Sequence, residues 1–251
     1  MTRHMIQLPE GVKVVSSEGS QAVFEIGPLM PGYGATVANP LRRVLLSSLE
    51  GAAITSIKIK GVDHEFGAIA GVLEDVIQII LNLKKVRVRS FSNDPVTVHL
   101  IAKGETNVTA MDIQVTSDIE LINPDQPICT LTDKKASLEM ELTIEKGRGY
   151  VSVEQRQKDK LPIGVIAIDA IFSPVHLVNF SLEDVRVGQR IDFNKVVMEV
   201  ETDGSIRPEQ ALKDAAIILA DHFNVIAAVA VPETAAKPAA KKAKKVVKKK
   251  E

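Results

Sequence analysis

The last helical segment of the chain, residues 208–228, places the strongest constraint on the fold, because it is apolar around much of its surface. It contains the runs AAIILA and VIAAVAV. Its main stripe, at helical spacing, consists of Ala211, Leu212, Ala215, Ile218, Leu219, Phe223 and Ile226. A helix of this kind is buried on more than one side, often against another subunit. The sequence therefore predicts an oligomer with this helix at the interface.

A second apolar helix is expected near the beginning of the chain, after a predicted β-hairpin over residues 11–29. A Gly-rich turn, residues 31–34, separates the hairpin from this helix. Because proline lacks the N–H that a helix interior needs, Asn39 is expected to cap the helix and Pro40 to be its first residue. Gly51 is expected to end it.

The middle of the chain is rich in alternating apolar and polar residues, which indicates strands. One helix interrupts them, predicted over residues 71–83. Turn signals are expected at 92–95, 103–104, 123–124 and 147–149. Strands are predicted at 52–60, 86–91, 96–101, around 120, and at 137–145, 163–170, 174–187 and 195–201. The fold class is therefore α+β, with a mostly antiparallel β region between the two apolar helices.

The charge is distributed unevenly. The chain has a formal net charge of −1, but residues 235–251 carry eight lysines and one acid, so the rest of the chain sums to −8. Lysine-rich tails bind phosphate backbones without sequence preference. A tail that merely keeps the protein in solution is the equally weighted alternative. The low complexity of the tail predicts disorder.

Other counts exclude several classes of protein. Cys129 is the one cysteine, so no disulfide can form within the chain, and a reducing cytoplasm fits best. It is expected to be a small core residue. No apolar run reaches about 18 residues, so no membrane-spanning helix is expected. The histidines are scattered, and no metal site or catalytic residue is predicted.

Two motifs leave a functional and a structural interpretation open. The Gly32-Tyr33-Gly34 turn before a helix could hold a phosphate, as an enzyme would use it, or could be a tight turn only. Arg42 and Arg43 could recognise carboxylates at an interface or could lie on a solvated helix face.

Several long segments closely resemble the bacterial RNA polymerase alpha subunit family. They follow the family order over roughly residues 10–230. The matching stretches are GYGATVANPLRRVLLSSLEGAAITSIKIKGVDHEF (32–66), GVLEDVIQIILNLKKV (71–86), KGRGYV (146–151), PIGVIAIDAIFSPV (162–175), VGQR (187–190) and MEVETDGSIRPEQAL (198–212).

The resemblance implies a discontinuous dimerisation domain formed by residues 1–50 and 174–232. Residues 51–173 would form an inserted, mostly antiparallel β domain, and residues 233–251 a basic, disordered tail. Family members are not catalytic themselves. They form a homodimer on which the beta and beta-prime subunits assemble, and these large subunits carry the magnesium-dependent nucleotidyl transfer. No cofactor is therefore expected in this chain, with magnesium expected in beta-prime.

The resemblance also implies roles for single residues. Contacts to the large subunits are expected at Arg42, Arg43, Lys84, Ile168, Arg186 and Arg190, with Arg43 the most important. Dimer or core packing is expected at Leu45, Leu46, Ile218 and Leu219. Non-specific DNA binding by the tail would use Lys241, Lys242, Lys244, Lys245, Lys248, Lys249 and Lys250. A free-standing, basic-tailed DNA-binding dimer is the alternative function.

Two departures from the family pattern stand out. Pro40 falls where relatives usually have a small, helix-compatible residue, so the helix is expected to start later. Relatives continue into a carboxy-terminal domain that binds upstream promoter DNA, and no such domain is expected before Glu251. The lysine tail is expected to supply a non-specific substitute for promoter-DNA affinity, while the usual route of activator recognition is expected to be absent.

Overall fold

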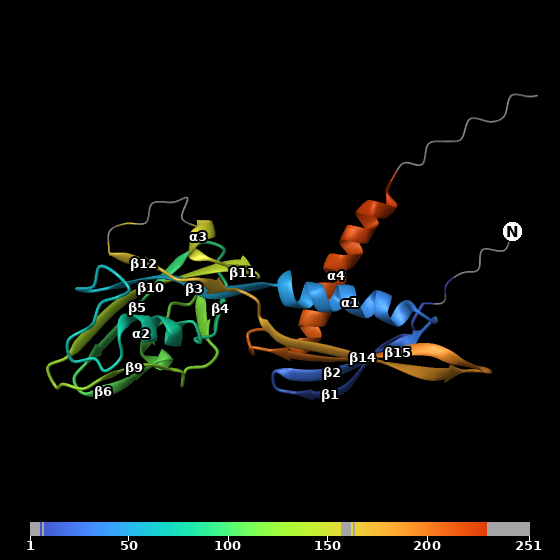
Figure 1. Cartoon of the computed structure of the whole chain (residues 1–251), viewed down its shortest axis with the longest axis horizontal. Helices are drawn as coiled ribbons and strands as arrows, with labels where there is room; N and C mark the ends of the chain where they lie inside the picture. The colour runs from blue at the N-terminus through green and yellow to red at the C-terminus, as the bar shows by residue number, and fades with distance from the viewer. Residues whose placement is uncertain (1–5, 7, 157–161, 163, 230–251) are drawn as a thin grey trace, which may run out of the picture.

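The computed structural model describes residues 6, 8–156, 162 and 164–229, and it has two regions that lie side by side along the long axis (Figure 1). We call them the terminal region, built from residues 11–49 and 175–227, and the insert region, built from residues 50–171. Each has its own cluster of buried apolar side chains. The mixed composition of helices and antiparallel strands confirms the predicted α+β class.

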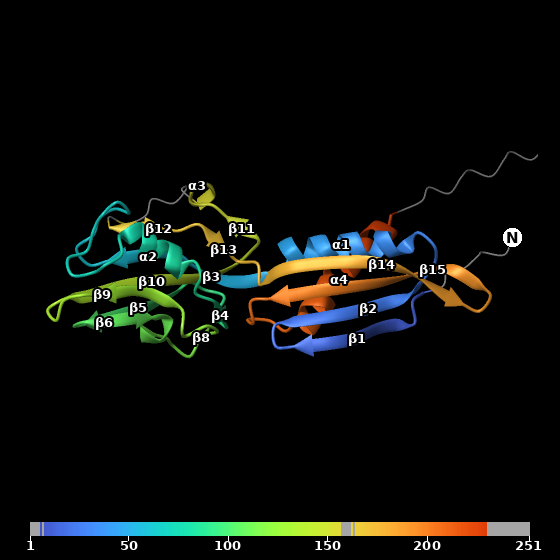
Figure 2. The same cartoon turned by 60° about the horizontal axis from the view of Figure 1, so that its bottom comes forward.

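The terminal region is a four-stranded antiparallel sheet with the strand order β1-β2-β15-β14. Helices α1 and α4 cover one face of it (Figure 2). Strand β2 shows why, since Ala22, Phe24 and Ile26 are buried and alternate with more exposed residues. The elements are β1 (Gly11–Glu18), β2 (Gln21–Leu29), α1 (Tyr33–Ser47), β14 (Val175–Val187), β15 (Arg190–Thr202) and α4 (Pro208–Ala227). The predicted hairpin over residues 11–29 is confirmed.

Helix α1 begins at Tyr33, so the prediction that Pro40 is its first residue is wrong. Gly34, Ala38, Leu41 and Leu45 form a buried stripe that runs past the proline onto the sheet. Burying such a stripe offsets the roughly 3 kcal/mol that a proline inside a helix costs. The helix ends at Ser47 rather than at Gly51, which already lies in strand β3.

The insert region contains a larger antiparallel sheet with the order β7-β5-β10-β3-β4-β8, and β12 also pairs with β3. Helix α2 packs its buried face against this region's core. The elements of this sheet and its helix are β3 (Glu50–Ile59), α2 (Val76–Leu83), β4 (Val88–Ser90), β5 (Val96–Lys103), β7 (Ile113–Gln114), β8 (Ile119–Leu121), β10 (Ser137–Arg148) and β12 (Val165–Ala167). The strands predicted near 52–60, 86–91, 96–101, 120 and 137–145 are confirmed.

Smaller elements complete the insert region. Strand β6 pairs with β9, and β11 pairs with β13, in two separate ribbons. They are β6 (Thr106–Thr109), a 3-10 turn (Ala110–Asp112), β9 (Pro127–Leu131), β11 (Tyr150–Val151), α3 (Val153–Arg156) and β13 (Ala170–Ile171). The single strand predicted at 163–170 is therefore wrong, since β12 and β13 belong to different sheets. Strand β10 also continues to Arg148, so the turn predicted at 147–149 begins only at Gly149, whose φ is +63°.

Helix α2 is shorter than predicted, because it begins at Val76 and not at Gly71. The Asp75 carboxylate accepts a hydrogen bond from the Gln78 amide at 2.7 Å and so caps the helix. The preceding Glu74 turns to β9, where its carboxylate accepts bonds from the amide and hydroxyl of Thr130. The Asp75 and Glu74 carboxylates thus accept hydrogen bonds from backbone amides. A helix that continued back to Gly71 would prevent these bonds.

Two connections join the regions, one from α1 into β3 and one from β13 into β14. They pass close together, because a Cβ at Gly51 would overlap the carbonyl oxygen of Phe172. The Ser173 hydroxyl also donates to the carbonyl of Leu46 at 2.9 Å. The predicted domain boundaries, 50/51 and 173/174, lie in these two connections. That the regions behave as separate domains stays a prediction.

Candidate interaction surfaces

Helix α4 extends beyond the sheet that it covers (Figure 1). Its buried residues all lie in its first half, Pro208, Ala211, Leu212 and Ala215. Beyond them, large apolar side chains are exposed to solvent, which is the usual mark of an interaction site. We call these residues the distal α4 surface: Ile217, Phe223, Val225, Ile226 and Val229, with exposed fractions between 48% and 77%.

None of the four residues expected in dimer or core packing belongs to this surface. Leu45 is 0% exposed and belongs to the core of its own chain, so of the two expected roles the structure supports core packing and not a dimer contact. The half-buried residues Leu46, Ile218 and Leu219 pack against that core from its edge. Sequence reasoning gave no role to Ile217, Val225 and Val229, although the apolar runs of this helix contained the signal.

Arg42 and Arg43 are exposed on the outer side of α1. The neighbouring Leu41 and Leu45 point into the core and fix the direction of the two arginines. Neither guanidinium pairs with a carboxylate within the part of the chain that the structure describes. The pair therefore presents two cations that no carboxylate among the described residues neutralises.

Lys84 lies at the end of α2 and forms an ion pair with Asp169 at 3.0 Å. The Asp169 carboxylate also accepts a bond from the Val153 amide at 2.9 Å. This amide first, and then Lys84, lowers the pKa of Asp169 below its usual value. Lys84 therefore ties α2 to the segment around α3, with about a quarter of its side chain exposed.

Ile168, expected to contact a large subunit, is 1% exposed and lies in the core of the insert region. Its amide donates to the carbonyl of Thr55, and its own carbonyl accepts a bond from Arg156. The Ile168 side chain is completely packed in the core of the insert region. The expected direct contact between this side chain and a large subunit is therefore wrong.

An exposed apolar stripe, which sequence reasoning did not single out, lies beside Lys84. Leu73, Ile77 and Leu81 are 71%, 39% and 51% exposed. The four-residue spacing of Ile77 and Leu81 puts them on the outer face of α2, opposite the buried Val76, Ile79 and Leu83. We call these three exposed residues the α2 stripe. The sequence did contain an indication of this stripe, because these three residues are apolar although other apolar residues already form the buried face of α2.

The tip of the β14–β15 hairpin carries the remaining expected contact residues. The Arg186 Nε donates to the carbonyl of Gly188 at 2.9 Å, which stiffens the tip. Arg190 pairs with Asp192 at 2.7 Å and lies over the Phe193 ring. Both guanidinium groups therefore have partners within the chain, in contrast to Arg42 and Arg43.

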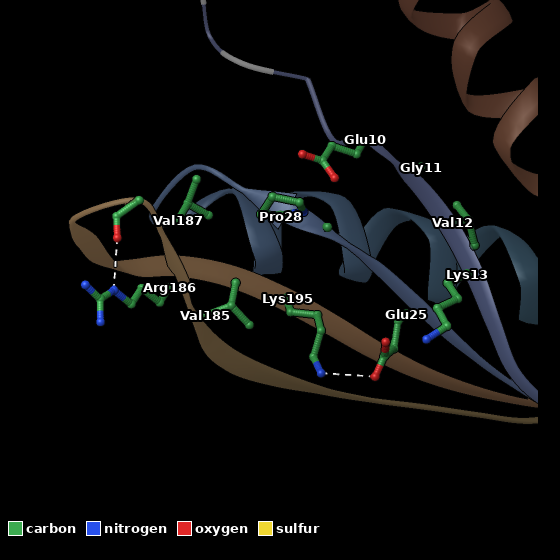
Figure 3. Close-up of a pocket in the computed structure, with 12 residues that line it drawn as sticks. Glu10, Gly11, Val12, Lys13, Glu25, Pro28, Val185, Arg186, Val187 and Lys195 are labelled. Carbon is green, nitrogen blue, oxygen red and sulfur yellow. Dashed lines mark hydrogen bonds and ion pairs between the residues drawn. The ribbon is translucent and has the colours of Figure 1, made fainter.

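A groove of about 680 Å³ opens between this tip and the hairpin β1–β2. Lys195 reaches from β15 to the Glu25 carboxylate on β2 at 3.0 Å, as Figure 3 shows, and to Glu183 at 2.8 Å. These two carboxylates raise the pKa of Lys195 above its usual value. The charges at the groove floor are thus largely neutralised within the chain.

The Gly32–Gly34 turn offers little to a phosphate. The Gly32 amide donates to the Asn194 side chain at 2.9 Å, and the Tyr33 amide donates to the Met30 carbonyl at 3.0 Å. A Cβ at Gly34 would lie 2.8 Å from the Leu182 side chain, so the turn is packed against β14. The turn interpretation holds, and the phosphate-binding one does not.

Chemistry-bearing side chains are dispersed. Within residues 6, 8–156, 162 and 164–229, no three His, Cys, Asp or Glu side chains gather as a metal site requires. Cys129 is buried, as predicted, and burial is the main cause that raises the pKa of its thiol to about 12. None of the helices described is long and apolar enough to cross a membrane. The seven tail lysines, 241–250, lie outside the described residues.

The chain is similar to known proteins over most of its length. Residues 57–173 match the family model described as "RNA polymerase Rpb3/RpoA insert domain". A DNA-directed RNA polymerase subunit alpha from Roseiflexus castenholzii is 50% identical over 222 residues, which are 88% of this chain and 68% of that protein. The same subunit from Salinibacter ruber is 48% identical over 225 residues, covering 89% and 68%.

A further relative, from Alkaliphilus oremlandii, is 51% identical over 211 residues, which are 84% of this chain and 66% of that protein. It too is a DNA-directed RNA polymerase subunit alpha. Identity near one half, sustained across both the terminal and the insert region, places this chain in the family of DNA-directed RNA polymerase alpha subunits.

Proposed function

We propose that two copies of this chain dimerise through α4 and the edge of α1, and that the dimer is the platform on which the beta and beta-prime subunits assemble in the cytoplasm. The exposed distal α4 surface is the observation that carries this proposal. Its five large apolar residues have no core of their own to enter. A two-fold axis would let one α4 cover the other, so that each copy buries the same surface.

The large-subunit contact is proposed first for Arg43, with Arg42 beside it. An exposed arginine without an ion-pair partner among the residues that the structure describes can offer its planar group to a carboxylate of another subunit. Arg186 and Arg190 are proposed as secondary contacts, because their guanidinium groups are already engaged. Nucleotidyl transfer and its magnesium ion are assigned to the large subunits.

The α2 stripe supports a second contact area on the insert region. It combines Leu73, Ile77 and Leu81 with the partly exposed cation of Lys84. The centre of a protein interface is apolar and its rim is polar, so the three apolar side chains would form the centre of this area and Lys84 its rim. We assign this area to the same assembly function and not to dimerisation, because it lies in the other region of the molecule from α4.

The experiment is the substitution Arg43→Ala, read out by capture of the beta and beta-prime subunits and by the mass of the alpha dimer. Truncating an interface arginine costs roughly 2 kcal/mol or more, which weakens binding at least about 30-fold. The dimer mass is expected to stay unchanged. Arg148→Ala, at another exposed arginine, is the matched control and should keep full capture. Unchanged capture by Arg43→Ala would contradict the proposal.

The tail adds a non-specific affinity for upstream DNA in this proposal. Its support is charge alone, since eight lysines and one acid occupy residues 235–251. Counterion release makes such binding strong at low salt and weak at high salt. A salt titration with and without residues 235–251 tests it, and equal affinities at low salt would remove the tail from the account.

A further inference from the structure

We propose that Arg89 is a clamp that fixes the orientation of the insert region relative to the terminal region. The residue lies on β4, between the buried neighbours Val88 and Ser90, which anchor its backbone in the insert sheet. Its side chain leaves this sheet and reaches the loop between β15 and α4. The clamp requires neither the dimer nor the large subunits.

The guanidinium group of Arg89 uses all three of its nitrogen atoms. Nε donates to the carbonyl of Ser205 at 2.7 Å, and Nη2 approaches the carbonyl of Gly204 at 3.5 Å. On the other side, Nη1 pairs with the Glu120 carboxylate at 2.8 Å. Glu120 lies directly across from Arg89 on β8, so the insert region itself holds the fork in place. Charged donors make the stronger class of hydrogen bond to such carbonyls.

The loop that receives Arg89 is built to present these carbonyl oxygens. The Asp203 carboxylate accepts bonds from both the amide and the hydroxyl of Ser205. The Thr202 hydroxyl donates to the carbonyl of Ile206 at 2.8 Å and so joins the two ends of the loop. Gly204 has a φ of +87°, and a Cβ there would lie 3.1 Å from Ile122 of the insert region. The loop is therefore rigid and closely packed where the clamp meets it.

A third contact is needed because the two connections between the regions pass side by side. The contacts around Gly51, Phe172 and Ser173 gather at one place and so act together as a single hinge. A hinge leaves rotation about its own line free. The Arg89 contact involves a different loop, between β15 and α4, and removes that rotation.

The orientation has a consequence for any partner that touches both regions. Arg43 belongs to the terminal region and the α2 stripe to the insert region, so their separation depends on the angle at the hinge. A fixed angle holds the two surfaces ready for one partner, which lowers the entropy cost of binding. Arg89 thus acts as a positioning residue, without touching the partner.

The test measures the angle directly, by single-molecule energy transfer between dyes on the two regions. Cysteines are introduced at the exposed positions Glu105, in the insert region, and Ser181, on β14. Cys129 is buried and does not compete for the dyes. The labelled chain is diluted into an excess of unlabelled chain, so each particle carries one dye pair. The variants are Arg89→Ala and Arg89→Lys, with Glu141→Gln, at an exposed carboxylate elsewhere in the insert sheet, as the control.

We expect one narrow distribution for the unchanged chain and for Glu141→Gln, and loss of that narrow population in Arg89→Ala. Arg89→Lys keeps the charge but lacks the planar fork, so it should also broaden the distribution. Hydrogen exchange within both cores should not change. A narrow, unshifted distribution for Arg89→Ala would overturn the proposal. If Arg89→Ala fails to fold, Arg89→Lys is the variant that tests the proposal. An unchanged distribution of energy transfer in Arg89→Lys would likewise overturn the clamp.

Discussion

Helices α2 and α4 show how differently the two regions of this molecule use a helix. Helix α2 has 8 residues, and its inner face, Val76, Ile79 and Leu83, is buried along the whole length in the insert core. Helix α4 has 20 residues, but buries side chains only as far as Ala215. The insert region buries the whole inner face of its helix in its own core, whereas the terminal region leaves the second half of an apolar helix exposed.

The first prediction concerns the exposed half of helix α4. Ile226→Asp places a charge on the distal α4 surface, where the side chain is 66% exposed in one chain. If this surface is buried in a dimer, the change should weaken dimerisation by roughly 2–4 kcal/mol, or about 30- to 1000-fold. Sedimentation velocity measures it.

The matched control is Leu81→Asp, which makes the same kind of change at an exposed apolar residue of the insert region. This variant should dimerise like the unchanged chain. If both variants weakened dimerisation equally, the distal α4 surface would not differ from the α2 stripe in its role in the dimer.

The second prediction compares the effect of a Leu→Ala cavity in the core of the terminal region with that of a Leu→Ala cavity in the core of the insert region. Leu45→Ala and Leu142→Ala both remove a side chain that is 0% exposed, so each should lower the free energy of unfolding by roughly 2–5 kcal/mol. Unfolding of the terminal region should shift with protein concentration, because it is linked to dimer dissociation.

Denaturant-dependent hydrogen exchange at two protein concentrations separates the two transitions. The loss in Leu142→Ala should be the same at both concentrations, whereas unfolding of the terminal region in Leu45→Ala should occur more readily in the dilute sample. Two transitions that shift equally with concentration would show that the insert region also relies on the dimer.

The third and smallest effect concerns acid sensitivity within the insert region. The Val153 amide and Lys84 lower the pKa of Asp169 below its ordinary 3.8, so the ionised carboxylate stabilises the folded chain. This contribution is complete above pH 3.8 and is lost as the pH falls through the lower pKa of the folded state. Asp169→Asn lacks it at every pH.

Melting curves of the unchanged chain and Asp169→Asn, recorded from neutral to acid pH, test this sign. The unchanged chain should be more stable at neutral pH, and the difference should close in acid. A difference that is constant over the whole range would assign it to packing and not to the charge of Asp169.

Much of the fold could be predicted from the sequence, because alternation along the strands directly reports which face is buried. The starts of both early helices could not. At α1, burial of the stripe from Gly34 to Leu45 outweighs the proline, and this burial depends on a sheet formed by distant strands. At α2, the bond between Asp75 and Gln78 moves the start to Val76.

The site residues divide in the same way. The exposure of at least one of Arg42 and Arg43 could be predicted, because adjacent residues on a helix point about 100° apart and cannot both face an apolar core. Their contact with a large subunit stays a prediction. Leu45 and Ile168 could not be placed, since a buried and an interfacial apolar residue look alike in a sequence. Arg89 depends on a loop more than a hundred positions away, a contact that no local pattern contains.

The most direct test of the central claim is the mass of the unmodified chain in sedimentation equilibrium at micromolar concentration. The account predicts a particle of twice 27.2 kDa, because the distal α4 surface is covered by a second copy. A particle of 27.2 kDa under these conditions would contradict it.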